Sequence, residues 1–130
     1  MKSINRVTFL GYIVADPEVK TTKNKKRVSS FVIATNNEWF DSEGELKKSV
    51  DFHRVVAWDH LAELSGKHLR KGSPIFLEGR LTNRSYEGKD KITHYITEVV
   101  ANTITILQWQ KERVHTEELS NQEEKELALA

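Results

Sequence analysis

Residues 50–72 read VDFHRVVAWDHLAELSGKHLRKG, a stretch in which a strand pattern runs directly into a helix pattern. In its first nine residues the apolar period is two, so Phe52, Arg54 and Trp58 share one face while His53 and Val55 share the other. A face that carries a guanidinium is a poor candidate for a dry interior. We therefore expect the face of Phe52 and Trp58 to be open to solvent.

Helical spacing begins after Trp58. Asp59 can cap a helix N-terminus, and Leu61, Leu64 and Leu69 form a short apolar stripe. Basic side chains near the end of this segment suit a helix C-terminus, and Gly72 suits the left-handed residue that follows one. The segment predicts one short helix.

Four further β-rich runs lie outside this stretch, at residues 7–14, 27–35, 74–86 and 92–107. The resulting order is three strands, one helix and two strands. This order fits the OB-fold, an all-β Greek-key barrel of five strands with one helix between strands 3 and 4, and it also fits an open α+β sheet. The polar connections at 20–26, 41–48 and 87–91 favour exposed hairpins, and so the barrel.

Composition limits the class of protein. With 130 residues, 38% of them hydrophobic and 30% charged, the chain fits one soluble globular domain. The absence of cysteine excludes disulfides, thiolate metal sites and a cysteine nucleophile. No apolar run reaches the roughly 18 residues of a membrane span. Asp16-Pro17 and the bulky Ile13 argue against a secretory signal at the N-terminus, so we expect a cytoplasmic protein.

Charge is distributed unevenly. Residues 1–109 carry a net charge of +4, whereas residues 110–130 carry −3 and contain no aromatic side chain. We expect a folded OB domain over 1–109 and an acidic tail, partly helical or disordered, over 110–130. A basic body with an acidic tail is a weak indication of nucleic-acid binding.

Aromatic and basic residues are interleaved through the predicted barrel. The aromatic set is Trp39, Phe52, Trp58 and Tyr86, and five cations fall within residues 20–27. Exposed rings stack on unpaired bases while cations follow the phosphates, which suits single strands of any sequence. The alternative is that the rings fill the core and the charged run is only a solvated loop.

Catalytic and metal-binding patterns are not evident. The chain has no His-Glu-x-x-His, Gly-rich phosphate loop or Gly-x-Ser-x-Gly motif. Asp51, His53 and His60 do not form a plausible ligand set, because Asp51 and His53 share one strand face while His60 begins the helix. We expect no enzyme activity, no metal and no cofactor, and we interpret His53 as packed or hydrogen-bonded at a protein–protein contact.

The sequence resembles the bacterial-type single-stranded DNA-binding protein family over about residues 4–107. The resemblance is carried by GYIVADPEV (11–19), FVIATNNEW (31–39), FHRVV (52–56), LAE (61–63), LRKGS (69–73) and LEGRL (77–81). It implies an OB-fold that assembles as a homotetramer, or as dimers with two folds per chain, around which single-stranded DNA wraps; for this chain we expect a tetramer.

The resemblance also assigns roles to individual residues. Stacking aromatics correspond to Trp39, Phe52, Trp58 and Tyr86, basic positions along the DNA path correspond to Arg54, Lys71 and Arg84, and a subunit contact corresponds to His53. From the charged hairpins we add Lys25, Lys26, Lys48 and Lys89 as expected DNA contacts.

Two departures from the family pattern bear on function. Ser85 stands where a lysine is common, and Asp59-His60 replaces the usual Gly-Lys, which predicts modest affinity and a shallow salt dependence. The chain ends in ELALA rather than in an acidic tip closed by phenylalanine, which puts recruitment by that route in doubt, although replication or repair proteins stay among the partners we consider.

The predicted function is sequence-independent binding and protection of single-stranded DNA during replication, recombination and repair. The alternative is an OB-fold paralogue specialised for primosome assembly, plasmid transfer or RNA binding.

Overall fold

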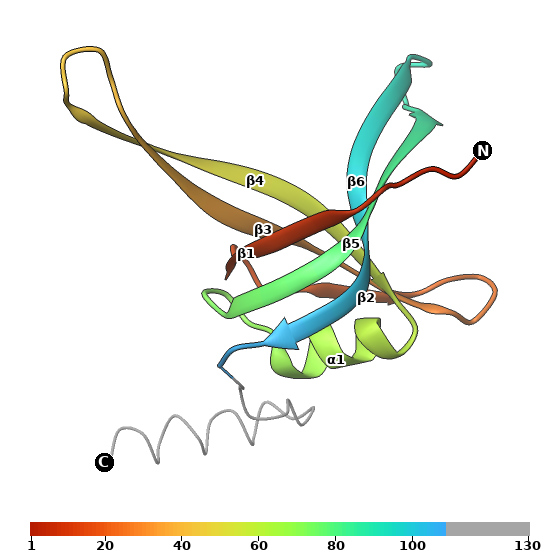
Figure 1. Ribbon diagram of the computed structural model, residues 1–130. Coiled ribbons are helices and arrows are strands. Elements are labelled where there is room, and N and C mark those ends of the chain that lie inside the picture. The colour runs from red at the N-terminus through yellow and green to blue at the C-terminus, as the bar shows by residue number, and fades with distance from the viewer. Residues whose placement is uncertain (109–130) are drawn as a thin grey trace, which may run out of the picture.

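The computed structural model describes residues 1–108 (Figure 1). Its elements, in chain order, are β1 (Val7–Ile13), β2 (Glu18–Thr21), β3 (Arg27–Phe40), β4 (Leu46–Trp58), α1 (His60–His68), β5 (Pro74–Glu87) and β6 (Thr93–Ile106).

Five of these strands close into a barrel. They follow the order β1-β5-β6-β4-β3, and β1 pairs with β3 as well as with β5, so the sheet has no open edge between them. The β4–β6 pair is parallel and the other pairs are antiparallel. The predicted OB-fold is therefore confirmed and the open sheet is excluded. The short strand β2 was not predicted; it follows Asp16-Pro17 and pairs with β3, from Glu18 opposite Ser30 to Thr21 opposite Arg27.

Two glycines allow the strands to approach at the points of closure. A Cβ atom on Gly11 would lie 2.3 Å from the carbonyl oxygen of Ala34 on β3. A Cβ atom on Gly79 would lie 2.3 Å from the carbonyl oxygen of Val100 on β6, beside the register shift at Glu78/Gly79. Side chains at these positions would force the neighbouring strands apart.

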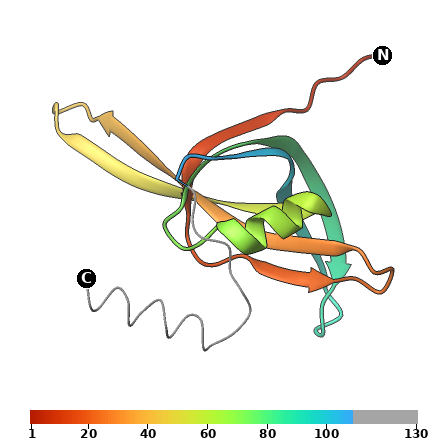
Figure 2. The same ribbon diagram turned by 90° about the horizontal axis from the view of Figure 1, so that it is seen from below.

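The core fills the barrel interior, and α1 covers one end of it (Figure 2). Fully buried side chains come from most of the barrel strands, and include Ile13, Ile33, Val55, Ile75 and Leu77. Leu61 and Ala62 attach the helix to this core. At the same junction the buried Ser65 Oγ donates a hydrogen bond to Ser29 Oγ at 2.7 Å.

The two residues predicted to begin and end the helix, Asp59 and Gly72, do not have the expected roles. Asp59 occupies the N-cap position, but its side chain makes no capping hydrogen bond and its φ is +54°. The helix ends at His68, because Leu69 adopts an extended conformation and is fully buried. Gly72, with φ +89°, instead belongs to the turn in which Ser73 N–H donates to the Arg70 carbonyl oxygen.

The β3–β4 hairpin is longer than predicted and projects beyond the barrel as a two-stranded ribbon (Figure 1). Continuous pairing runs from Val28 opposite Trp58 to Phe40 opposite Leu46. Residues 36–48 are exposed or half-buried, so this part of the ribbon buries neither of its faces. Trp39 consequently lies within β3 rather than after it.

Within residues 1–108, no helix has the length and apolar character needed to cross a membrane. The predicted acidic tail, residues 110–130, lies outside the described residues.

Candidate nucleic-acid interface

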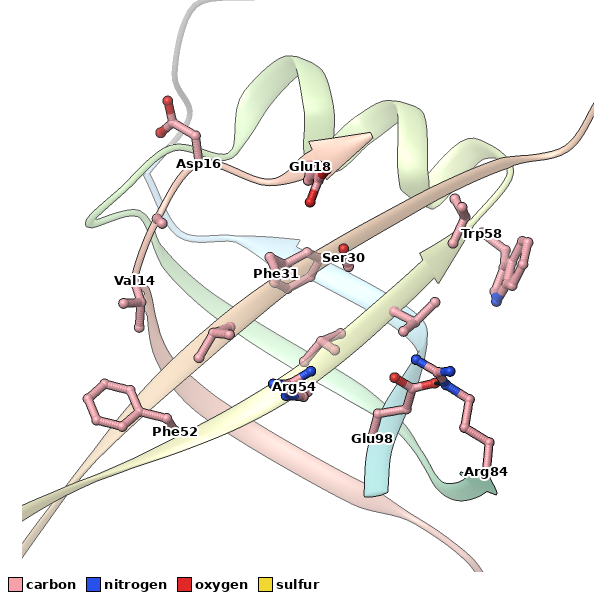
Figure 3. A pocket seen from close by; sticks show the side chains of 15 residues that line it. Val14, Asp16, Glu18, Ser30, Phe31, Phe52, Arg54, Trp58, Arg84 and Glu98 are labelled. Atoms are coloured by element: carbon pink, nitrogen blue, oxygen red, sulfur yellow. Dashed lines mark hydrogen bonds and ion pairs between the residues drawn. The ribbon is translucent and has the colours of Figure 1, made fainter. Parts of the chain in front are cut away.

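A groove of about 920 Å³ runs over the outer face of β3 and β4 (Figure 3). Its floor comes from these two strands, and its sides come from the β1–β2 connection and the β5–β6 hairpin. The residues that line it are Val14, Ala15, Asp16, Glu18, Val28, Ser30, Phe31, Val32, Phe52, Arg54, Val55, Val56, Trp58, Arg84 and Glu98.

Strand register positions the aromatic residues of the groove. Val55 and Ala57 point into the core, so alternation turns Phe52, Arg54 and Trp58 outward. Phe52 is 65% exposed and Trp58 is 39% exposed, which confirms the predicted open face. Figure 3 shows the two rings toward opposite ends of the β4 segment, with Arg54 between them. At about 3.3 Å per residue their Cα atoms lie roughly 20 Å apart, which leaves room for more than one base.

Charges in the groove are nearly balanced. Arg84 Nε lies 2.8 Å from Glu98 Oε1, and Glu18 pairs with Lys20 at 3.3 Å. Asp16 Oδ1 accepts a hydrogen bond from the backbone N–H of Lys71 at 2.8 Å. Arg54 makes no ion pair with any residue in 1–108, which makes its guanidinium the groove cation most available to a phosphate.

Tyr86 extends the same face along the β5–β6 hairpin. It lies two residues from Arg84 on β5 and is 45% exposed. Its cross-strand partner is His94, and the two rings stack with centroids 5.2 Å apart and planes 24° apart. His94 was not among the predicted site residues. Pairing the two strands across the turn at 88–92 would have placed it opposite Tyr86.

Trp39 is not brought together with the groove. Trp39 pairs with Lys47, and Phe52 pairs with Ala34. Successive pairs along the ribbon alternate between its two faces, and these two pairs are separated by an odd number of positions. Trp39 therefore lies on the opposite face of the ribbon from Phe52. Its indole is 46% exposed.

Of the predicted basic contacts, Arg54 and Arg84 line the groove and the lysines lie around it. Lys25 and Lys26 belong to the turn between β2 and β3, and Lys89 to the turn between β5 and β6. Lys48 lies on the ribbon, 3.9 Å from Glu38. The structure also brings three carboxylates, Asp16, Glu18 and Glu98, to the groove, which sequence analysis did not anticipate.

His53 lies on the strand face opposite Phe52. Its Nε2 is 2.9 Å from Thr35 Oγ1, and its ring stacks on Phe9 with centroids 4.4 Å apart. The side chain is thus packed and hydrogen-bonded within the chain. In the part of the chain that the structure describes, no three His, Asp or Glu side chains are grouped to hold a metal ion.

Comparison with known proteins identifies the family. The model of the single-strand binding protein family matches residues 4–107. The chain belongs to this family. Two curated relatives, both named single-stranded DNA-binding protein, come from Neisseria meningitidis serogroup A and serogroup B. Each is 36% identical over 105 residues, which are 81% of this chain and 60% of the relative. The match therefore spans less than two thirds of these relatives' length.

Solved structures agree with this assignment. The complex of the Plasmodium falciparum SSB with single-stranded DNA is 31% identical, with a TM-score of 0.75, and the match covers 83% of this chain and 98% of that one. A deletion mutant of the single-stranded DNA binding protein from Thermus aquaticus is 28% identical, with a TM-score of 0.72. In that case the match covers 81% of this chain and 51% of the other.

Proposed function

We propose that this protein binds single-stranded DNA without sequence preference, as a binding protein rather than an enzyme. Bases stack on Phe52, Trp58 and Tyr86, and Arg54 contacts the phosphates. The family membership and the likeness to a structure titled as a complex with single-stranded DNA support this proposal.

The observation that carries the proposal is the exposed pair Phe52 and Trp58 on one strand face, with Arg54 between them. Both rings keep surface open to solvent on which a base can stack. A flat ring, a guanidinium without an ion pair among residues 1–108, and a second flat ring match the alternation of base and phosphate along a nucleic-acid strand.

The wider setting is also a proposal. The chain works as a homo-oligomer, most simply a tetramer, with His53 near the subunit contact, in the cytoplasm beside the nucleoid. It covers exposed strands during replication, recombination and repair. Trp39, Lys71 and the hairpin lysines Lys25, Lys26, Lys48 and Lys89 extend the DNA path beyond the groove.

Fluorescence anisotropy with labelled oligo-dT, oligo-rU and a DNA duplex of equal length tests the function. We expect oligo-dT to bind most tightly, and Trp58→Ala to weaken binding by about 1–3 kcal/mol while the unfolding transition stays close to that of the wild type. Preference for the duplex would contradict the proposal. Preference for oligo-rU would favour an RNA-binding paralogue.

A further inference from the structure

The β5–β6 hairpin holds an imidazole that the proposed stacking contacts do not use. His94 lies on the same hairpin face as Arg84 and Glu98, both of which line the groove, because Tyr86, its cross-strand partner, is two residues from Arg84. Its side chain is 41% exposed. A nucleic-acid strand that leaves the groove along this hairpin would pass over the Tyr86–His94 pair.

The turn is shaped around this ring. A Cβ atom on Gly88 would lie 2.9 Å from His94 Cδ2 and Nε2, and 2.6 Å from Asp90 Oδ1, so a larger residue there would require these two side chains to shift. His94 Nε2 is 3.2 Å from Asp90 Oδ2, and Asp90 Oδ1 accepts the backbone N–H of Ile92 at 3.1 Å. The imidazole is therefore held in place by a stack on one side and a carboxylate at one nitrogen.

The two ring nitrogens have different environments. Nε2 donates to Asp90, whereas Nδ1 makes no hydrogen bond to any residue in 1–108. In the neutral ring with the proton on Nε2, Nδ1 is an acceptor and repels a phosphate oxygen. Protonation converts Nδ1 into a donor and removes one net negative charge from the His94–Asp90 pair.

We propose that His94 is a further nucleic-acid contact, and that single-stranded DNA binds more tightly when its imidazole is protonated. This inference rests on the proposed function. The titratable and charged groups around the ring are Tyr86, which stacks on it, Asp90 in contact with it, Lys89 and Lys91 in the same turn, and the Arg84–Glu98 pair further along the face.

Asp90 keeps its charge throughout the relevant pH range. The backbone N–H of Ile92 and the hydrogen bond from His94 hold the pKa of Asp90 below its ordinary value of 3.8. Histidine is the side chain that proteins use as a charge switch near neutral pH. Because the protonated ring offers Nδ1–H to a phosphate and the neutral ring does not, we expect affinity to increase as pH falls.

Anisotropy titrations of the full chain with oligo-dT, between pH 5.5 and 8.5 at fixed ionic strength, test the inference, because neither thymine nor the phosphodiester titrates there. We expect affinity to rise about 3- to 10-fold toward low pH. His94→Gln removes most of this rise, and His94→Arg binds at pH 8.5 as the wild type binds at pH 5.5. His68→Gln, at the end of α1, is the matched control and keeps the wild-type pH dependence.

An unchanged pH dependence in His94→Gln overturns the role of His94, even if DNA binding itself is strong. The same follows if wild-type affinity is flat across the range. Failure of the wild type to bind oligo-dT at any pH would instead contradict the proposed function, so the two failures are distinguishable.

Discussion

Asp59 has the most unusual backbone conformation near the groove. With φ +54° and ψ −121°, it adopts a conformation that glycine occupies readily and other residues rarely. Its N–H donates to the Arg27 carbonyl oxygen and its carbonyl oxygen accepts the Glu63 N–H, so the conformation is held at both ends. The residue links Trp58, which lines the groove, to α1, so its negative charge lies one residue from an aromatic residue of the groove.

We expect Asp59→Gly to raise the free energy of unfolding by about 1 kcal/mol, because relief of strain of about 1–3 kcal/mol exceeds the entropic cost of glycine. Urea denaturation measures this effect. Asp59→Asn is the control, since it removes the charge but keeps a Cβ atom. Both variants should bind oligo-dT more tightly, and only the glycine variant should gain stability. Equal or lower stability of Asp59→Gly would show that the site is not strained.

At the scale of elements, the β5–β6 hairpin has two faces with one exposed tyrosine on each. Tyr86 lies on the face of Arg84, whereas Tyr95 pairs with Ser85 on the opposite face and is 83% exposed. We expect Tyr86→Ala to weaken oligo-dT binding by about 1–3 kcal/mol and Tyr95→Ala to leave it within about twofold. Anisotropy titration measures both. Equal losses would mean that the groove face does not define the DNA path.

The contact of α1 with β3 should be sensitive to acid. The hydrogen bond and charge of Lys67, and then the charge of Arg27, hold the pKa of Glu63 below its ordinary value of 4.5. The folded state therefore binds fewer protons at this group than the unfolded state, and the stabilisation is lost as pH falls below about 4.5. Thermal melts between pH 3 and 7 should show a smaller decrease for Glu63→Gln than for the wild type. An identical decrease would contradict this assignment.

How well an element could be predicted depended on whether it buries a face. The outward face of Phe52, Arg54 and Trp58 could be predicted because Val55 and Ala57 form an apolar alternate row. The parts of β3 and β4 that form the ribbon could not be predicted, since residues 36–48 bury neither face and therefore show no alternation of apolar and polar side chains. The end of α1 was misplaced because Leu69 reaches the core from an extended backbone, which helical spacing does not reveal.

For the site as a whole, the sequence predicted the residues on β4 and β5 but not how they assemble. Barrel closure brings Asp16, Glu18 and Glu98 to a groove that we expected to be basic. Register places Trp39 on the other face of the ribbon from Phe52, so a strand that contacts both must continue past the groove. These relations depend on strand pairing between distant segments, which local patterns do not determine.

Across the whole molecule, the near balance of groove charges predicts a shallow salt dependence. Each phosphate neutralised contributes a slope of about −0.7 to the plot of log K against log salt concentration. We expect Arg54→Gln to make this slope shallower by about 0.7, because Arg54 is the groove cation without an ion pair in the described chain. Lys48→Gln, which removes a cation already paired with Glu38, should change the slope less. A larger change in slope for Lys48→Gln than for Arg54→Gln would place the phosphate contacts on the ribbon.

The central claim is that Trp58 lies open in the groove and stacks on unpaired bases. It is tested most directly by intrinsic fluorescence of a variant that keeps Trp58 while Trp39 and Trp109 are replaced by phenylalanine. Stacking predicts saturable quenching when oligo-dT is added, and quenching at saturation that persists in high salt. Unchanged Trp58 emission at low salt, with the DNA bound by anisotropy, would contradict the account.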